Sequence, residues 1–150
     1  MLIGTAETTI DDKGRLTLSK NWHPELAPGF FMTRGFDQCL FIFPETVFES
    51  IVRDLGGQTI ASSDVRAFAR HLAVFAEQGK LDRQGRIILP PNLRQFAGVN
   101  AQVMVVGVFD RLEVWDAKTF AEINAQSEAN ATQVAEKYSN MIHNIPQIRK

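Results

Sequence analysis

Residues that form disulfides or bind metals are scarce in this chain of 150 residues. Cys39 is the one cysteine, so an intramolecular disulfide is excluded, and we expect it to be a small buried residue of an apolar strand. His23, His71 and His143 share no metal-binding spacing with one another or with Cys39. The sequence therefore predicts no metal site and no cofactor.

Long apolar runs are missing as well. No run approaches the roughly 20 residues that cross a bilayer, and Met1–Gly4 lacks the charged and apolar regions of a signal peptide. We therefore expect a cytoplasmic protein without a membrane partner. Because 45% of the residues are hydrophobic and 22% are charged, the composition is that of one compact globular unit with its own core.

The common catalytic constellations are also absent from the sequence. It has no evident pair of carboxylates, no Ser/His/Asp set and no phosphate-binding Gly-x-Gly series. An enzyme is therefore not expected, and no catalytic residue is predicted. Excess charge of one sign is missing too, since the formal net charge is -1. Any contact with a polyanion must then be confined to one part of the surface.

What the sequence does contain is an internal repeat. The segment Ile10–Asn21 reappears as Leu81–Asn92, each position shifted by 71 as from Arg15 to Arg86. Five positions are identical, namely Asp11/Asp82, Gly14/Gly85, Arg15/Arg86, Leu18/Leu89 and Asn21/Asn92. Two copies in one register indicate a duplication. Each half is too short to bury much core without packing on its twin.

The repeat continues downstream of these segments. Phe31–Phe43 can be aligned with Met104–Trp115, with one residue fewer in the second copy. Each copy then leads into an amphipathic helix. The first is expected to open at Pro44-Glu45 and to stop at Gly56-Gly57, and the second is expected to be capped by Asp116.

Two longer stretches also have helical spacing. Ala61–Gln78 has an apolar stripe that suits either core packing or a contact between subunits, formed by Val65, Phe68, Leu72 and Phe75. Ala117–Tyr138 is the other predicted helix. Beyond it, residues 139–150 are apolar for a chain end, and we expect them to pack on a neighbouring subunit or on the chain's own helices.

The repeated segment has the composition of a β-hairpin. Ala6–Ile10 and Arg15–Leu18 alternate like strands, and Asp12-Lys13-Gly14 supplies a tight turn between them. Gly14 and its equivalent Gly85 are expected at positive φ, which a glycine adopts without steric cost.

An Asp-x-x-x-Arg motif spans each turn. Asp11 is placed to hold the Arg15 guanidinium through a charge-assisted hydrogen bond, and Asp82 is placed in the same way for Arg86. Such a pair either stabilises the turn, by well under about 1 kcal/mol at a surface, or positions the arginine for a ligand. Both partners recur in both copies while neighbouring surface positions differ, which favours the second interpretation.

Basic residues gather at the two motifs. In the second segment, four cations face one anion, which gives a local charge of +3: Lys80, Arg83, Arg86 and Arg94 with Asp82. In the first segment, three cations face two anions, which gives a local charge of +1: Lys13, Arg15 and Lys20 with Asp11 and Asp12. If the halves pack about a pseudo-twofold axis, their arginines lie together on one surface.

These motifs, together with Thr33–Pro44 and Val106–Asp116, closely resemble the bacterial MraZ family over about residues 3–125. The resemblance implies an α+β fold with a mainly β core. In it, a tandem pseudo-twofold pair of AbrB-like swapped-hairpin modules forms one small β-barrel flanked by helices. We expect a first module over residues 1–57, a connecting helix over 58–79, a second module over 80–125, and a C-terminal helix and tail over 126–150.

The resemblance also implies a function. It points to a sequence-specific DNA-binding transcriptional regulator of the division and cell-wall gene cluster, including its own promoter. Its partners would be double-stranded DNA carrying short direct repeats, and further copies of itself in a ring-like homo-oligomer, in the cytoplasm at the nucleoid. The serious alternative is an AbrB-like protein-interaction module, an antidote or an assembly scaffold, with weak or no DNA binding.

The family's DNA-contact motif falls on Asp11 and Arg15 in the first half and on Asp82 and Arg86 in the second. Arginine suits this role because its planar fork binds a guanine edge or a phosphate at two points. Phosphate contacts are expected from four further basic residues, Lys13, Lys20, Lys80 and Arg83.

The two halves depart from each other after the second strand of the motif. The first half has Ser19 and His23 where the second has Pro90 and Arg94. Ser19 is expected to cap the short helix that Pro90 opens in the other half. The loss of a proline and of a basic residue bears on the affinity that the first half contributes. Because Lys13 matches the Lys-Gly-Arg turn of the family and Gln84 does not, the two halves are expected to differ in how they bind DNA.

Overall fold

The computed structural model describes residues 1–139, which fall into two compact units, Met1–Ala117 and a second that begins at Lys118. The chain end that was expected to pack on a subunit or on helices lies, from residue 140 on, outside the described residues. The first unit contains the strands of both halves of the repeat and both Asp-x-x-x-Arg motifs. It is therefore the unit that matters for function.

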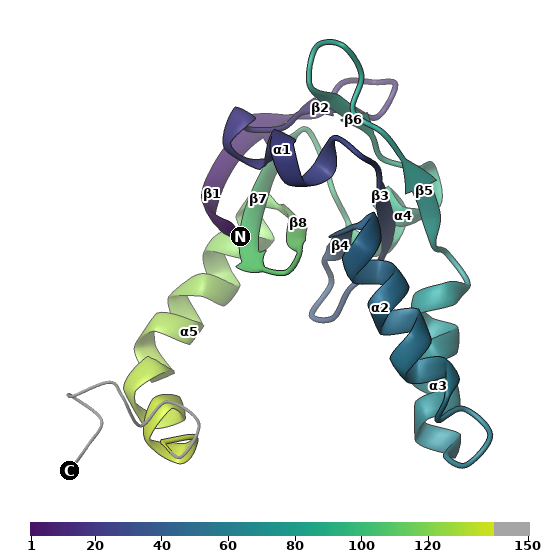
Figure 1. Cartoon of the computed structure of the whole chain (residues 1–150). Coiled ribbons are helices and arrows are strands. Elements are labelled where there is room, and N and C mark those ends of the chain that lie inside the picture. The colour runs from purple at the N-terminus through teal and green to yellow at the C-terminus, as the bar shows by residue number, and fades with distance from the viewer. Residues whose placement is uncertain (140–150) are drawn as a thin grey trace. The chain divides into compact units, whose positions relative to one another are not determined.

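The two halves have the same order of elements (Figure 1). The first consists of β1 (Leu2–Thr9), β2 (Arg15–Thr17), the 3-10 turn η1 (Lys20–Trp22), α1 (His23–Leu26), β3 (Phe30–Arg34), β4 (Leu40–Pro44) and α2 (Glu45–Gly56). After α3 (Ser63–Ala73), the second consists of β5 (Glu77–Gly79), β6 (Arg86–Ile88), α4 (Pro91–Ala97), β7 (Gln102–Phe109), β8 (Leu112–Asp116) and α5 (Ala117–Lys137). The duplication of sequence is thus a duplication of structure.

Strands of both halves share one antiparallel sheet with the order β1-β7-β8-β4-β3-β5. The order is symmetric, because equivalent strands of the two halves stand at equal distances from the two edges: β1 and β5 at the edges, then β7 and β3, then β8 and β4 at the centre. Each half gives its first strand to the other, because β1 pairs with β7 and β5 pairs with β3. The predicted α+β class is confirmed, and its strands are exchanged between the halves.

The single closed barrel is not confirmed. Within the described residues, β1 and β5 are the two edges of the six-stranded sheet and do not pair with each other. Strands β2 and β6 form a separate two-stranded sheet. The β core is therefore open, with a large sheet and a small one.

The predicted hairpin within each half is wrong in its strand pairing. β2 pairs with β6 of the other half, which places Leu16 opposite Ile87, and β1 pairs with β7. Leu16 and Ile87 are each 1% exposed. Because one half is too small to cover these side chains by itself, pairing across the duplication buries more apolar surface than a local hairpin would.

Helix α2 lies where it was predicted, whereas α3 is shorter than Ala61–Gln78. It begins after Ser62, whose hydroxyl accepts a hydrogen bond from the Val65 N–H at 3.3 Å. It ends at Ala73, because Glu77–Gly79 forms β5 against Phe30–Met32. Pairing in the sheet thus outweighs the apolar spacing that had suggested a longer helix.

The apolar stripe of α3 packs within the chain. Leu72 is 5% exposed, and its carbonyl accepts a hydrogen bond from the buried Thr33 hydroxyl of β3. Phe68 packs on Phe36, with ring centroids 5.6 Å apart. Of the two uses expected for this stripe, core packing is the one that these contacts support.

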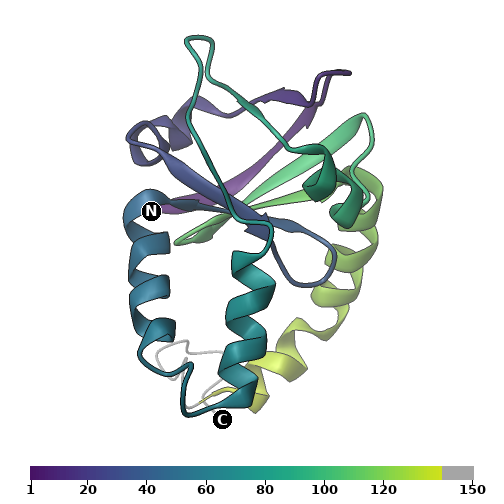
Figure 2. The same ribbon diagram turned by 90° about the vertical axis from the view of Figure 1, so that its right-hand side faces the viewer.

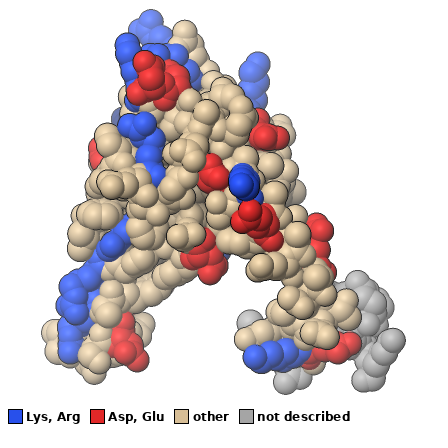
Figure 3. Space-filling view, turned by 180° about the vertical axis from the view of Figure 1, so that it is seen from behind, with Lys and Arg blue, Asp and Glu red and all other residues tan. Residues whose placement is uncertain are grey.

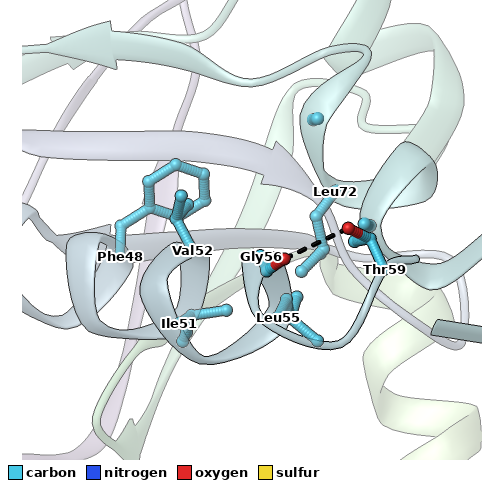
Figure 4. Close-up of a pocket in the computed structure, with 9 residues that line it drawn as sticks. Phe48, Ile51, Val52, Leu55, Gly56, Thr59 and Leu72 are labelled. Carbon is cyan, nitrogen blue, oxygen red and sulfur yellow. Dashed lines mark hydrogen bonds between the residues drawn. The ribbon is translucent and has the colours of Figure 1, made fainter. Parts of the chain in front are cut away.

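Helices α2 and α3 lie side by side and extend away from the end of the unit that carries the two turns (Figures 1 and 2). An apolar pocket lies between them (Figure 4), lined by side chains that include Phe48, Ile51, Val52, Leu55 and Leu72. At its end the Thr59 hydroxyl donates to the Gly56 carbonyl at 3.2 Å. This helical layer is separate from the motif-bearing end.

The hydrophobic core draws equally on both halves. Its most deeply buried side chains include Leu16, Leu18, Leu26 and Phe30 from the first half and Ile87, Leu89, Leu93 and Val103 from the second. Helix α5 confirms the helix predicted over Ala117–Tyr138. In the part of the chain that the structure describes, no helix is long and apolar enough to cross a membrane.

Leu16→Ala is expected to destabilise the first unit by about 2–5 kcal/mol, because it removes a buried side chain at the centre of the pairing between the halves. Thr17→Ala is the matched control, since Thr17 is exposed on the same strand and its loss should cost less than about 0.5 kcal/mol. Urea unfolding of both variants beside the wild type measures the difference. Equal midpoints for the two variants would contradict this role of the β2–β6 pairing.

Candidate nucleic-acid interface

The first turn is closed around the carboxylate of Asp11. Its Oδ1 accepts hydrogen bonds from the backbone N–H groups of Lys13 at 3.0 Å and Arg15 at 2.9 Å. Its Oδ2 accepts from Arg15 Nε at 2.7 Å. Backbone bonds from Gly14 N to the Asp11 carbonyl and from Asp11 N to the Arg15 carbonyl, both 3.0 Å, complete the turn. The predicted Asp11–Arg15 bond is confirmed, and it fixes the direction in which the guanidinium leaves the turn.

The second turn repeats this geometry bond for bond. Asp82 Oδ1 accepts from the N–H groups of Gln84 at 2.8 Å and Arg86 at 2.9 Å, and Oδ2 accepts from Arg86 Nε at 2.8 Å. The two backbone bonds are again 3.0 Å each. Gln84 takes the place of Lys13 without loss because this position supplies only a backbone N–H to the turn.

Hydrogen bonds within the turns hold both carboxylates in the ionised form. The backbone N–H of Arg15 is the main cause that keeps the pKa of Asp11 below its ordinary value of 3.8, and the Arg15 guanidinium and the Lys13 N–H lower it further. Arg86 and Gln84 lower the pKa of Asp82 in the same way. The resulting stabilisation is present above the unfolded-state pKa near 3.9 and is lost as the pH falls through the lower folded-state values. At neutral pH both carboxylates are therefore ionised.

Each turn is also bound by the opposite half. The Leu89 N–H donates to the Gly14 carbonyl at 2.8 Å, and the Leu18 N–H donates to the Gly85 carbonyl at 3.0 Å. These two bonds extend the pairing of β2 with β6 at both of its ends. The position of one turn relative to the other is thus set by backbone hydrogen bonds.

Both turn glycines have the predicted positive φ, 80° at Gly14 and 74° at Gly85. Each is also covered by a side chain of a short helix, His23 of α1 or Arg94 of α4. A Cβ atom at Gly14 would lie 2.8 Å from the Leu89 carbonyl oxygen and 3.2 Å from Arg94 Cζ. At Gly85 it would meet the imidazole ring of His23. A side chain at Gly14 would therefore displace a backbone carbonyl, and one at Gly85 would displace the His23 ring.

His23 and Arg94 are residues that the sequence analysis had not placed at the turns. They are equivalent positions, because the same shift of 71 relates them as relates Arg15 to Arg86. His23 Nε2 donates to the Leu18 carbonyl at 3.0 Å. The signal that could have located them is this constant shift, which extends the repeat beyond the Asp-x-x-x-Arg motif.

Arg15 and Arg86 emerge on the same face of the two-stranded sheet. Arg15 lies opposite Ile88 and Arg86 lies opposite Thr17, so the arginines are diagonal neighbours on the two strands, a relation that spans roughly 7–8 Å. Their side chains are 32% and 30% exposed. Within residues 1–139, no protein group accepts a hydrogen bond from Nη1 or Nη2 of either arginine. Each guanidinium thus keeps its outer nitrogens for a ligand.

The other predicted contact residues are all exposed. Both turns project from the same end of the first unit (Figures 1 and 2), where Lys13 and Arg83 are exposed. Lys20 in η1 and Lys80 after β5 are also exposed. Figure 3 shows basic side chains gathered at this end with acidic ones among them. The structure therefore brings the two Asp–Arg pairs together and leaves the other four predicted cations exposed.

Cys39 has the buried position that was predicted for it. It is 0% exposed, its Sγ donates to the Phe36 carbonyl at 3.0 Å, and burial raises the pKa of the thiol. Among residues 1–139, no group of three His, Cys, Asp or Glu side chains has an arrangement that could hold a metal ion.

Two interlocked copies of one strand-turn-strand unit, with a pair of aspartate-held arginines on one face, define a tandem-repeat α+β protein. The model of one family, described as "MraZ protein, putative antitoxin-like", matches the chain twice, over residues 1–71 and 72–141. The chain therefore belongs to the MraZ family.

Individual relatives give the same assignment. The Transcriptional regulator MraZ of Symbiobacterium thermophilum is 40% identical over 135 residues, which are 90% of this chain and 98% of the relative. The proteins of the same name from Thermobifida fusca and Roseiflexus castenholzii are each 38% identical, over 91% and 94% of this chain and 96% and 99% of their own lengths. The family is thus one of transcriptional regulators and not of enzymes.

Gly14→Ala is expected to destabilise the unit more than Gly98→Ala, although both glycines have a positive φ. Gly98, at φ +64°, has no atom within 4 Å of a Cβ position, so alanine there should cost only about 1–2 kcal/mol of backbone strain. At Gly14 the Leu89 carbonyl must also move, which adds about 1–3 kcal/mol. Urea unfolding of the two variants measures the difference. A smaller loss at Gly14 would show that the turn adapts to a side chain.

The carboxyl groups of Asp11 and Asp82 are expected to titrate below 3.8 in an NMR pH series. In Arg15→Ala, the pKa of Asp11 should stay below 3.8, because alanine keeps the backbone N–H that is the largest cause of the lowering. Asp82 serves as the internal control and should not change. A return of Asp11 to 3.8 or above in this variant would assign the effect to the guanidinium instead.

Proposed function

We propose that this protein is a sequence-specific transcriptional regulator that binds double-stranded DNA through its paired Asp-x-x-x-Arg turns. Its target is the promoter of the division and cell-wall gene cluster, including its own upstream DNA, in the cytoplasm at the nucleoid. The site consists of Asp11 and Arg15 in one half and Asp82 and Arg86 in the other. The names of its relatives support the regulatory class, and the geometry of the turns supports the mode of binding.

The observation that carries this proposal is the repeated Nε–carboxylate bond, 2.7 Å in one turn and 2.8 Å in the other. Because the aspartate binds Nε, it holds the guanidinium without occupying its outer nitrogens. Two such donors match the O6 and N7 acceptors of guanine in the major groove, or two oxygens of a phosphate. An aspartate–arginine pair that served only to close the turn would not need to leave the outer guanidinium nitrogens unbonded in both halves.

The spacing of the arginines also fits a duplex. Diagonal neighbours of an antiparallel pair are roughly 7–8 Å apart, which is close to two base-pair rises of about 3.4 Å each. Because backbone bonds between the halves set this separation, the two forks reach the DNA as one rigid pair. Each half would then contribute to the recognition of one short sequence element.

Cations around the face supply the contacts that orient the protein without reading sequence. Lys13 and Arg83 are exposed at the two turns and are placed to contact phosphates, as are Lys20 and Lys80 beside the small sheet. Such contacts confine the electrostatic attraction to one end of a chain whose net charge is -1.

Recognition of several direct repeats requires several copies of the site. We therefore include in the proposal a ring-like homo-oligomer, in which successive subunits present their turns to successive repeats. The resemblance to the family supports this assembly. Exposed apolar side chains such as Ile3, Val52 and Phe109, at 59%, 53% and 67%, offer surfaces on which copies can meet.

The description of the family as antitoxin-like favours one alternative, a protein-interaction module that acts as an antidote or an assembly scaffold. In that case the aspartate–arginine pairs would be structural or would bind acidic groups of a protein partner. The requirement for Arg15 and Arg86 in binding DNA separates the two functions.

The proposal is tested by fluorescence anisotropy with the DNA upstream of the protein's own gene and a scrambled duplex, at two salt concentrations. Arg15→Ala/Arg86→Ala should lose the preference for the native duplex, because each two-point guanine contact contributes about 1–3 kcal/mol of discrimination. Wild-type affinity should fall with salt by a log-log slope of about 0.9 per phosphate contact.

Two control variants make the result specific. Arg53→Ala removes one positive charge from exposed α2, away from the turns, and should bind like the wild type. Arg15→Lys/Arg86→Lys keeps the charge but loses the planar fork, so it should retain salt-dependent binding and lose discrimination. Feeble, equal binding of both duplexes by wild type and all variants would overturn the proposal and favour the protein-interaction module.

A further inference from the structure

The outer face of the two-stranded sheet carries two side chains besides the arginines. Leu16 and Ile87 are 1% exposed and occupy the core side, so the alternate positions of the two strands share the opposite face. On that face Ile88 lies directly across from Arg15, and Thr17 directly across from Arg86. Cβ atoms of residues that face each other in this way are roughly 4.5–5.5 Å apart.

Ile88 is 61% exposed, unlike its neighbours Ile87 and Leu89, which are 1% and 0% exposed. A single exposed isoleucine is ordinary on a protein surface, so exposure alone carries no argument. The position of Ile88 is what distinguishes it, because it stands beside an arginine whose outer nitrogens are open. It also lines a shallow groove together with Lys80. Ile88 thus has the Arg15 side chain directly across the strand pair and Lys80 in the same groove.

We propose that Ile88 is a specificity-determining residue, which contacts the C5-methyl group of a thymine one base-pair step from the guanine that Arg15 binds. This inference rests on the proposed function of the two turns. The C5-methyl of thymine is the one apolar group that a standard base pair presents in the major groove, and aliphatic side chains recognise it by contact. The cross-strand Cβ distance from Arg15 to Ile88, roughly 4.5–5.5 Å, exceeds one base-pair rise of about 3.4 Å by less than the length of either side chain, so the two side chains can reach adjacent base pairs.

Thr17 occupies the equivalent place beside Arg86, since the shift of 71 relates it to Ile88. Threonine offers a methyl group and also a hydroxyl that can donate to or accept from other bases. The Arg15–Ile88 pair therefore demands thymine next to guanine, whereas the Arg86–Thr17 pair tolerates other neighbours. The two halves of the chain differ in sequence selectivity for this reason.

The test replaces each thymine of the native duplex in turn by deoxyuridine, which removes only the methyl group, and measures affinity by fluorescence anisotropy. For the wild type, one thymine position in the binding element should weaken binding about fourfold, the factor that corresponds to about 0.8 kcal/mol for one buried carbon. Ile88→Ser should bind thymine and deoxyuridine equally at that position. Its urea unfolding midpoint should equal that of the wild type, because the side chain is exposed.

Ile60→Ser is the matched control, because Ile60 is 94% exposed in the turn after α2 and should keep the full effect of the methyl group. Wild-type binding that is indifferent to deoxyuridine at every position, yet still lost in Arg15→Ala/Arg86→Ala, overturns the role of Ile88 and leaves the proposed function standing. A methyl effect that persists in Ile88→Ser also overturns it. Duplex binding by Arg15→Ala/Arg86→Ala that equals binding by the wild type overturns the proposed function itself.

Discussion

The antiparallel pairing of β2 with β6 is the interaction on which the rest of the structure depends. It is only three residues long on each strand, yet it is extended at both ends by hydrogen bonds to the carbonyls of Gly14 and Gly85. Its inner face supplies Leu16 and Ile87 to the core, and its outer face carries both arginines. Stability and the geometry of the candidate site are therefore properties of the same few backbone bonds.

The pseudo-twofold arrangement does not make the halves functionally equal. Where each half covers the turn glycine of the other, the first uses the imidazole of His23 and the second uses the guanidinium of Arg94. Histidine also bonds the Leu18 carbonyl, whereas Arg94 Nε is buried without a hydrogen-bond partner among the described residues. The two turns are alike in their own bonds and unlike in what supports them, so duplication has preserved the turn and allowed its surroundings to differ.

The sequence alone was sufficient for features that depend on residues close together in the chain. The Asp11–Arg15 bond, the positive φ of Gly14 and the extent of α2 follow from local spacing and turn chemistry, and the structure has all three. Strand partners could not be predicted in this way, because β1 and β2 each have a nearer candidate in sequence than the one they bind. Likewise, nothing in Glu77–Gly79 has a strong strand preference, and β5 forms because the edge of β3 is available. The open sheet is a further consequence of such long-range pairing.

Exchange of strands between the halves has a consequence for how the chain folds during synthesis. Leu2 pairs with Phe109, so the first strand of the sheet cannot find its partner until nearly the whole first unit has left the ribosome. At about 5–20 residues per second, that interval is on the order of 5–20 s, far longer than hydrophobic collapse. During this time a nascent first half exposes apolar strands that fit the second half of any copy. Strand pairing within one chain then competes with strand pairing between nascent chains on the same messenger RNA. The order of synthesis helps to decide whether a half pairs with a strand of its own chain or of another copy.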